Sequence, residues 1–568
     1  MHVGQQPADR TEATGAAGTV LPVRQSLSAG LGGARPEARR LRAAAAWIAG
    51  GLALAALFTR ISMAGQLNSD GANIALQGWD MLHGHLLLHG WITADASYYT
   101  FEVPQLAMAE LLFGLTSLAA HVVSALTYVI VTALAVAVAR TGSRGTAAAA
   151  RSAVVLAVLA VPVVTWPGVA TLLEAPQHVG TAAYLLGPLL LIDRAREWRF
   201  TAPLAGLILF AGQIGDATVL YVAVPTVLLV CAYRVLAAPR RVPGGYLRAV
   251  AQRIRTPDPD AAVLLAAAAS VPLAMLARAA MRYFGAYVLV PPRTAISATR
   301  LWWPHLVITW QNVRVLFGAA VAAPGTALDV AAAAFGWACL LAAAFGFARV
   351  VWTWRTASRA EQFAAAAIVI NLGVYTVSKI PVTAFASSRE IAAVLPCGAV
   401  LAARAFVPAR IAQAARARVA FAAIALAALL PLAAGAAQPV ETPAAVPVAA
   451  WLRAHGYHYG IAGYWDASVV TLESGNDVLV RAIVVRHNQF KPYYWETKPE
   501  WYAASGHDAT FVIADAPNAR PYAGVTVTAA ERYFGRPVAV HWVADREILL
   551  YRTNLLQRLA APYEPRDR

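Results

Sequence analysis

The chain has 568 residues, of which 59% are hydrophobic and 13% charged, and its formal net charge is +16. Soluble domains carry about 25% charged residues, so this composition excludes an ordinary soluble protein and indicates a polytopic membrane protein. The positive charge does not indicate a nucleic-acid partner. From Glu441 to the end there are 13 basic and 13 acidic residues, so the excess lies in short loops between apolar segments.

The N-terminal part of the chain predicts a tail followed by a membrane helix. Residues 1–38 are rich in Gly, Ala and polar residues without periodicity, which predicts a disordered cytoplasmic tail. Arg39, Arg40 and Arg42 then precede an apolar span at 43–63. A cleaved signal peptide has a shorter apolar region nearer the N-terminus, so a retained transmembrane helix is expected.

Ten further apolar segments follow, and several approach the roughly 20 residues that cross a bilayer. A total of about eleven transmembrane helices puts the N-terminus inside and the C-terminus outside. The segments lie at 118–139, 152–168, 178–193, 201–215, 218–233, 261–281, 329–348, 362–378, 389–403 and 419–436.

The distribution of basic residues agrees with this topology. No Lys or Arg occurs between Arg60 and Arg140, whereas Arg residues gather at 140–151, 194–199, 234–255, 349–359 and 404–418. Cytoplasmic loops accumulate Lys and Arg, so residues 39–436 are predicted to form the membrane domain, with 64–104 as its first outer loop. Because abundant Arg and Ala are typical of a GC-rich bacterial genome, we expect the bacterial cytoplasmic membrane as the location.

The C-terminal region, residues 437–568, has a mixed composition and is predicted to be a small extracytoplasmic α/β domain. Alternating strands and helices carry this prediction, and Asp466 is expected to cap one of the helices. No disulfide framework is expected there, since Cys231, Cys339 and Cys397 all lie in apolar segments. The predicted helices are 447–455, 466–473 and 527–534, and the predicted strands are 459–464, 478–485, 509–514, 538–543 and 547–551, the last two forming a hairpin.

Candidate catalytic residues lie in the first outer loop. Asp70 follows the first span directly, and Asp95 and Glu102 lie in an aromatic stretch that leads back into the membrane. A carboxylate at the membrane surface can accept a proton from an acceptor hydroxyl, and partial burial raises its pKa toward that role. The alternative is that Asp70 caps an interfacial helix and the aromatic residues form a headgroup belt.

A second group of candidates comprises Glu174, His178 and Asp216. Glu174 and His178 are four residues apart, so on a helix they would share a face and could contribute to a pocket or hold a divalent ion. Two ligands do not make a metal site, so no metal and no other cofactor is expected. Asp216 ends the fifth span, where an ionisable residue near membrane depth suggests function, with a turn residue as the alternative.

Basic residues on the predicted outer side are exceptions to the charge rule and are candidates for binding a phosphate. They are Arg293, Arg300, Lys379 and Arg389. Arg and Lys stabilise the charge that develops on a phosphate leaving group. Snorkelling toward lipid headgroups is the alternative for each, and Arg389 is also expected to pair with Glu390.

The layout resembles the GT-C superfamily of integral-membrane glycosyltransferases, in particular the protein O-mannosyltransferases and the lipid A aminoarabinose transferases. The shared features are an acidic residue right after the first span, interfacial helices behind it, about eleven spans and a C-terminal outer domain. Gly71 stands where the mannosyltransferases carry a second carboxylate. The resemblance implies transfer of a sugar from a polyprenyl-phosphate donor to an envelope glycan, lipid or protein, with Asp70 as general base.

Two other functions remain open on the sequence. A transporter or flippase of an envelope lipid or solute would show repeated halves and ionisable groups inside its spans. The acidic groups here cluster outside the spans, which favours the enzyme. A non-catalytic assembly factor that kept the GT-C layout is the third possibility.

Overall fold

The computed structural model describes residues 26–194, 198–237, 258–291, 295–320, 327–383, 385, 387–408, 415–515 and 524–563. The chain divides into two compact units, Met1–Ala53 and Leu54–Arg568. Helix α1, Ser26–Ser62, begins in the first unit. Residues 26–38 are therefore helical rather than irregular as predicted, because the Ala and Arg residues there favour helix and continue the apolar span toward the N-terminus. Residues 1–25 of the predicted tail lie outside the described residues.

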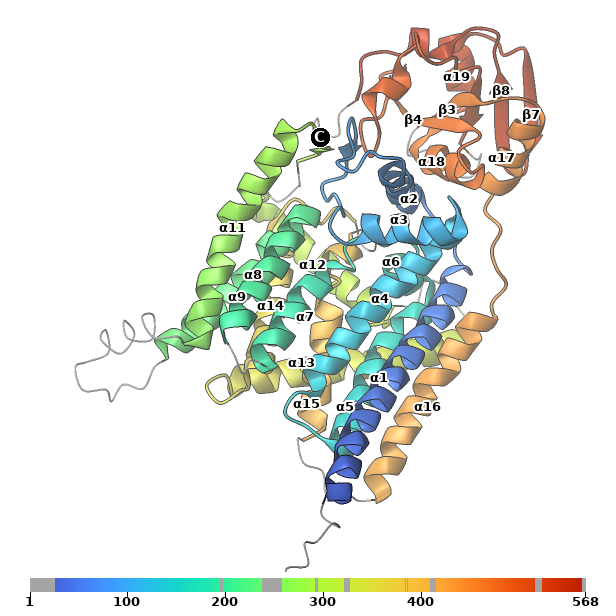
Figure 1. Ribbon diagram of the computed structural model, residues 1–568. Coiled ribbons are helices and arrows are strands. Elements are labelled where there is room, and N and C mark those ends of the chain that lie inside the picture. The colour runs from blue at the N-terminus through green and yellow to red at the C-terminus, as the bar shows by residue number, and fades with distance from the viewer. Residues whose placement is uncertain are drawn as a thin grey trace, which may run out of the picture. The chain divides into compact units, whose positions relative to one another are not determined.

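The membrane domain of the second unit is a bundle of helices (Figure 1). Seven helices in the described part of the chain, α1 included, are long and apolar enough to cross a membrane. The bundle helices are α4 (Ser117–Arg140), α5 (Gly145–Ala160), α6 (Trp166–Leu172), α7 (Thr181–Arg194), α8 (Trp198–Gly215), α9 (Val224–Leu236), α11 (Pro259–Tyr283), α12 (Trp302–Leu316), α13 (Ala327–Trp352), α14 (Arg359–Val377), α15 (Val394–Phe406) and α16 (Ala415–Ala437). Short helical turns are η1 (Pro162–Val164), η2 (Val219–Ala223), η3 (Thr299–Leu301) and η4 (Ser388–Ile391).

A helix covers the main part of every predicted apolar span, so the chain is a polytopic helical membrane protein. The number of crossings and their orientation stay predictions. Helix α12 was not predicted. It begins with Trp302, Trp303 and His305 and has Arg314 in its last turn, so its sequence does not contain a long uninterrupted apolar run. The small side chains of the bundle allow close helix packing. A Cβ added at Gly346 of α13 would lie 2.6 Å from the carbonyl oxygen of Leu401 in α15.

The first outer loop forms two surface helices and one short strand. These are α2 (Ser69–Leu82), β1 (Ile92–Thr93) and α3 (Glu102–Phe113). β1 pairs in parallel with β2 (Val288–Leu289), which follows α11. The interfacial helix expected after Asp70 is therefore present as α2, and Ala72, Ala75 and Leu76 are buried in it.

The C-terminal region forms a six-stranded sheet with the order β5-β4-β3-β6-β8-β7. Strands β3, β4 and β6 are parallel, while β5, β8 and β7 are antiparallel to their neighbours. The elements are α17 (Ala445–Ala454), β3 (Tyr459–Gly463), α18 (Tyr464–Glu473), β4 (Leu479–Arg486), β5 (Gln489–Pro492), η5 (Pro499–Tyr502), β6 (Phe511–Ala514), α19 (Val527–Phe534), β7 (Ala539–Val543), β8 (Arg546–Leu550) and η6 (Leu555–Arg558). The predicted hairpin is β7–β8. The predicted cap is wrong: α18 begins at Tyr464 after Gly463, and Asp466 instead pairs with Arg546 at 2.9 Å.

The sheet domain contacts the first outer loop directly. The backbone N–H of Ile92 donates to the carbonyl of Thr497 at 2.7 Å, and the N–H of Thr497 donates back to Ile92 at 3.0 Å. Lys498 Nζ lies 2.9 Å from Asp80 Oδ2. The hydroxyl of Ser69 donates to the backbone carbonyl of Tyr464 at 2.5 Å. These contacts bring the N-terminus of α18 and the segment around Thr497 against the start of α2.

Candidate functional site

Asp70 lies in the first turn of α2, where membrane domain and sheet domain meet. Its Oδ1 is 2.6 Å from the hydroxyl of Tyr464, and its Oδ2 is 3.4 Å from Nη1 of Arg389. The same Arg389 nitrogen donates a short hydrogen bond to Gln177 Oε1. We call Asp70, Arg389, Gln177, Tyr464 and the neighbouring Glu496 the Asp70 cluster. It joins one carboxylate to a cation and a phenol, and the Asp70 side chain keeps 14% of its surface exposed.

Asp70 does not cap α2. The cap is Asn68, whose side-chain oxygen accepts from the N–H of Gly71 at 3.0 Å. The capping alternative for Asp70 is therefore wrong, because the preceding Asn already satisfies that end of the helix. Asp70 still lies in the first turn, where the free N–H groups of the helix favour negative charge. Its carboxylate is left to contact Arg389 and Tyr464.

A second cluster surrounds His178 and lies deeper in the membrane domain. His178 Nδ1 is 2.9 Å from Asp216 Oδ2, and His178 Nε2 is 3.3 Å from Glu390 Oε1. Thr181 donates a short hydrogen bond to the same oxygen of Asp216. Burial alone would raise the pKa of Asp216, but the charge and hydrogen bond of His178 lower it to about 2. We call His178, Asp216, Glu390 and Thr181 the His178 cluster.

Glu174 and His178 do not share a helix face as the sequence suggested. Helix α6 ends at Leu172, and both residues lie in the loop that precedes α7, where His178 has a φ of 56°. The Pro at 176 interrupts helix formation between them. Charges of the Asp70 cluster act on Glu174. Burial raises the pKa of Glu174 to about 7, while Arg389 lowers it and the charge of Asp70 raises it further. The two candidates therefore belong to different clusters.

Asp95 and Glu102, the other predicted catalytic residues, lie on the side of His178. Asp95 lines a small cavity together with His178, Asp216 and Glu390. Glu102 opens α3 and is 3% exposed, and a Cβ added at Gly180 would lie 2.1 Å from its Oε1. Burial together with the charge of Asp216 raises the pKa of Glu102 to about 8.

Turn η4 joins the two clusters, because its adjacent residues Arg389 and Glu390 contact different clusters. Arg389 contacts Asp70 and Gln177, while Glu390 contacts His178. The local pairing of these two residues that the sequence suggested is therefore replaced by partners from distant loops. The hydroxyl of Ser388 in the same turn lies 2.8 Å from the hydroxyl of Thr171, which fixes η4 against α6.

Two of the other predicted phosphate-binding residues, Arg300 and Lys379, lie at exposed positions. Arg300 in η3 is exposed, and Lys379 is exposed with its backbone N–H donating to Ala295. Arg293 lies outside the described residues. Of the four predicted cations, the described contacts place Arg389 beside Asp70.

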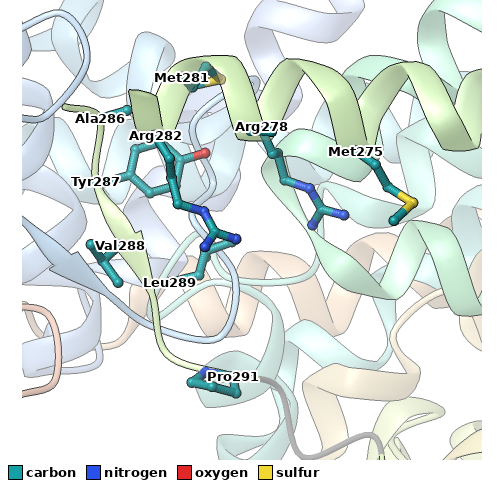
Figure 2. Close-up of a pocket in the computed structure, with 10 residues that line it drawn as sticks. Met275, Arg278, Met281, Arg282, Ala286, Tyr287, Val288, Leu289 and Pro291 are labelled. Atoms are coloured by element: carbon teal, nitrogen blue, oxygen red, sulfur yellow. The ribbon is translucent and has the colours of Figure 1, made fainter. Parts of the chain in front are cut away.

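An open groove beside the end of α11 has a volume of about 760 Å³. Figure 2 shows the side chains of Arg278 and Arg282 on the same side of α11, above the segment from Val288 to Pro291. Met275, Met281, Leu289 and Pro291 supply apolar lining. The groove therefore combines an apolar surface with two cations one helical turn apart, a composition that suits an amphiphile with an anionic head.

One side chain connects the groove to the loop beside the His178 cluster. Tyr287 lines the groove, and its hydroxyl donates to Ser97 Oγ at 3.0 Å. The next residue, Tyr98, packs its ring edge to face with His178 at a centroid distance of 5.4 Å. The loop that carries Asp95 therefore contacts both a residue of the groove and His178.

Sequence reasoning missed Glu496, Gln177 and Asn73, and it gave Tyr464 no place beside Asp70. These residues come together through tertiary contacts between segments several hundred positions apart. The one sequence signal for Glu496 is its place as an acidic residue within an aromatic run, Tyr493-Tyr494-Trp495-Glu496.

Glu174 and His178 were the two residues that the sequence offered as possible ligands of a divalent ion. Within the described residues, no group of three or more His, Cys, Asp or Glu side chains is arranged to hold a metal ion. Asp216 and Glu390 instead each form an ion pair with His178.

Comparison with known proteins shows similarity of structure but not of sequence. No protein-family model matches the chain, and no curated protein matches its sequence. ArnT from Cupriavidus metallidurans, in a crystal structure with undecaprenyl phosphate bound, has a TM-score of 0.53 and 13% sequence identity over 91% of this chain and 99% of its own. The apo form of that ArnT has a TM-score of 0.51 and 12% identity over the same shares. The oligosaccharyltransferase of Archaeoglobus fulgidus has a TM-score of 0.44 and 12% identity, over 85% of this chain and 72% of its own.

ArnT is a GT-C superfamily glycosyltransferase, and its match extends over nearly the whole of both chains. The polytopic helical membrane fold inferred from the sequence is therefore confirmed. The protein has the fold of the GT-C glycosyltransferases.

Proposed function

We propose that the protein transfers a sugar from a polyprenyl-phosphate donor to a hydroxyl group of a cell-envelope acceptor at the outer membrane surface, with Asp70 as general base. The observation that carries this proposal is the setting of Asp70. Its carboxylate lies between the guanidinium of Arg389 and the phenol of Tyr464 at the surface of a membrane domain. Its side chain keeps 14% of its surface exposed.

The fold supports a lipid-linked donor. ArnT, which shares this fold, was crystallised with undecaprenyl phosphate bound. In the present chain the groove beside α11 suits the same chemistry, since Met275, Met281 and Leu289 would contact a prenyl chain and Arg278 with Arg282 would contact a phosphate. The predicted topology puts this end of α11 on the outer side of the membrane.

The proposed step is a single displacement at the anomeric carbon of the sugar. The acceptor hydroxyl gives its proton to the Asp70 carboxylate as its oxygen forms a bond to the anomeric carbon. The bond from that carbon to the phosphate oxygen breaks, and its electron pair leaves with the polyprenyl phosphate. Cationic side chains near the phosphate stabilise the charge that develops on it.

The test is transfer of labelled sugar by the purified full-length protein in nanodiscs supplied with a panel of undecaprenyl-phosphate-linked sugars. Asp70→Asn is expected to lower the rate at least about 100-fold, because the amide cannot take the proton. Asp477→Asn, at an exposed pair with Arg453, is the matched control and is expected to act like the wild type. An unchanged rate for Asp70→Asn would remove the base assignment.

Binding of undecaprenyl phosphate, measured together with transfer and with movement of the lipid, distinguishes a glycosyltransferase from an assembly factor and a flippase. Replacing both Arg278 and Arg282 by Ala is expected to weaken binding at least about tenfold, because charged hydrogen bonds to the phosphate are lost. Arg453→Ala serves as the control, since this exposed arginine lies in the sheet domain. Binding without transfer from any donor would favour the assembly factor, and movement of the lipid across the bilayer would favour the flippase.

A further inference from the structure

Two carboxyl groups share one phenol at the contact between the sheet domain and α2. The hydroxyl oxygen of Tyr464 lies 2.6 Å from Asp70 Oδ1 and also 2.6 Å from Glu496 Oε2. A phenol carries a single proton and can donate to one of them only. If both carboxyl groups were ionised, one would face the lone pairs of the phenol at hydrogen-bond distance. The geometry therefore requires a second proton, held by Asp70 or by Glu496.

The surroundings decide which group holds that proton. Glu496 is 2% exposed, its Oε1 has no hydrogen-bond partner among the described residues, and no cation contacts it. Its neighbours are neutral donors and other acids: Asn73 donates to Oε2 at 3.2 Å, and the charges of Asp70 and Asp95 lie nearby. Burial, followed by the charge of Asp70, raises the pKa of Glu496 well above its usual value.

Asp70 has the opposite surroundings. It is more exposed, it contacts Arg389, and it lies at the N-terminus of α2, although Glu174 also faces it from the loop after α6. A cation and a helix N-terminus both favour the ionised carboxylate. The negative charge of the pair is therefore best placed on Asp70 and the proton on Glu496.

We propose that Glu496 is a protonated positioning residue that donates to Tyr464, so that Tyr464 donates to Asp70 and holds the base ionised and oriented. This inference rests on the proposed function of Asp70. It assigns to the C-terminal domain a direct part in the catalytic site. The backbone supports the arrangement: Glu496 has a φ of 49°, and the following residue Thr497 pairs with Ile92, which directs Glu496 toward α2.

Infrared spectroscopy of the full-length protein in nanodiscs near neutral pH tests the protonation without any substrate. The difference between wild type and Glu496→Gln should contain the C=O band of a protonated carboxyl group. The difference between wild type and Asp70→Asn should contain the bands of an ionised carboxylate. An ionised band for Glu496, or a protonated band for Asp70, would overturn the inference even if transfer itself is confirmed.

Transfer kinetics test the positioning role. Glu496→Gln keeps a donor for Tyr464 and is expected to stay within about threefold of the wild-type kcat, whereas Glu496→Leu and Tyr464→Phe should each lose about tenfold or more. In the wild type, kcat should fall at alkaline pH as Glu496 loses its proton and competes with Asp70 for the phenol. Glu496→Gln should lack this fall.

The kinetic outcomes distinguish the failure of the inference from the failure of the proposed function. If Asp70→Asn retains transfer, the base assignment is wrong whatever Glu496 does. If Asp70→Asn is inactive but Glu496→Gln is as impaired as Glu496→Leu, or Glu496→Leu equals the wild type, the positioning role is wrong. Rates are compared per folded protein, so a loss of stability in Glu496→Leu does not count as support.

Discussion

Each of the two clusters contains two carboxyl groups, but these groups have different partners. In the His178 cluster, an imidazole lies between the carboxylates of Asp216 and Glu390, and the side chains of His178 and Asp216 are 7% and 5% exposed. In the Asp70 cluster, a partly exposed carboxylate contacts a cation and a phenol supplied by distant segments. Carboxylates paired with a buried cation stabilise a fold, whereas a carboxylate that contacts a phenol and a guanidinium at the junction of two domains is free of such a buried imidazole and can act as a base.

The largest expected effect on stability is at His178. His178→Gln leaves Asp216 and Glu390 as buried carboxylates without the cation between them, and breaking a buried pair in this way costs about 3–5 kcal/mol. Thermal unfolding in detergent measures the loss. An unfolding temperature equal to that of the wild type would show that the imidazole is not part of a stabilising ion pair.

The pH dependence of the unfolding temperature tests whether Glu102 is a neutral carboxyl group in the folded protein. Its pKa rises from 4.5 to about 8 on folding, so the folded state binds a proton that the unfolded state has lost. The stabilisation that this proton gives the folded state is complete below the pKa of Glu102 in the unfolded state, and it is lost as pH rises toward about 8. The unfolding temperature of the wild type should therefore fall over this range, and Glu102→Gln should reduce the slope. A slope that is unchanged in Glu102→Gln would contradict the buried neutral carboxyl.

A smaller effect is expected where the sheet domain contacts the outer loop. Lys498 is 8% exposed in its side chain and lies 2.9 Å from Asp80, which also accepts from the indole of Trp91. Lys498→Met should lower stability by about 1–3 kcal/mol, because Asp80 loses a charged partner. A double-mutant cycle with Asp80→Asn measures the coupling, and a coupling of zero would show that this pair does not hold the two regions together.

The smallest effect is expected at the surface. Arg453 and Asp477 are 3.5 Å apart with side chains 57% and 60% exposed. Exposed pairs contribute between 0 and about 1 kcal/mol, so Arg453→Ala should leave stability and transfer nearly unchanged. A large loss would mean that this face of the sheet domain has a role that the two clusters do not explain.

Local pattern was sufficient to predict most helices and the strands of the C-terminal region, because length, hydropathy and periodicity are properties of contiguous residues. It also selected Asp70, Arg389, His178 and Asp216, since ionisable residues at the ends of apolar spans are uncommon. It failed where proximity depends on tertiary contacts. Glu174 and His178 are separated by a Pro-containing loop, and Tyr464 and Glu496 reach Asp70 only because the sheet domain folds back onto α2.

The most direct test of the central claim compares Asp70→Asn with His178→Gln in the same assay, with transfer expressed per folded protein. We expect Asp70→Asn to unfold at nearly the wild-type temperature but to lose at least about 100-fold in transfer rate. We expect His178→Gln to lose stability and to keep its rate per folded molecule. The reverse pattern, an active Asp70→Asn and an inactive but stable His178→Gln, would contradict the assignment of the chemistry to the Asp70 cluster.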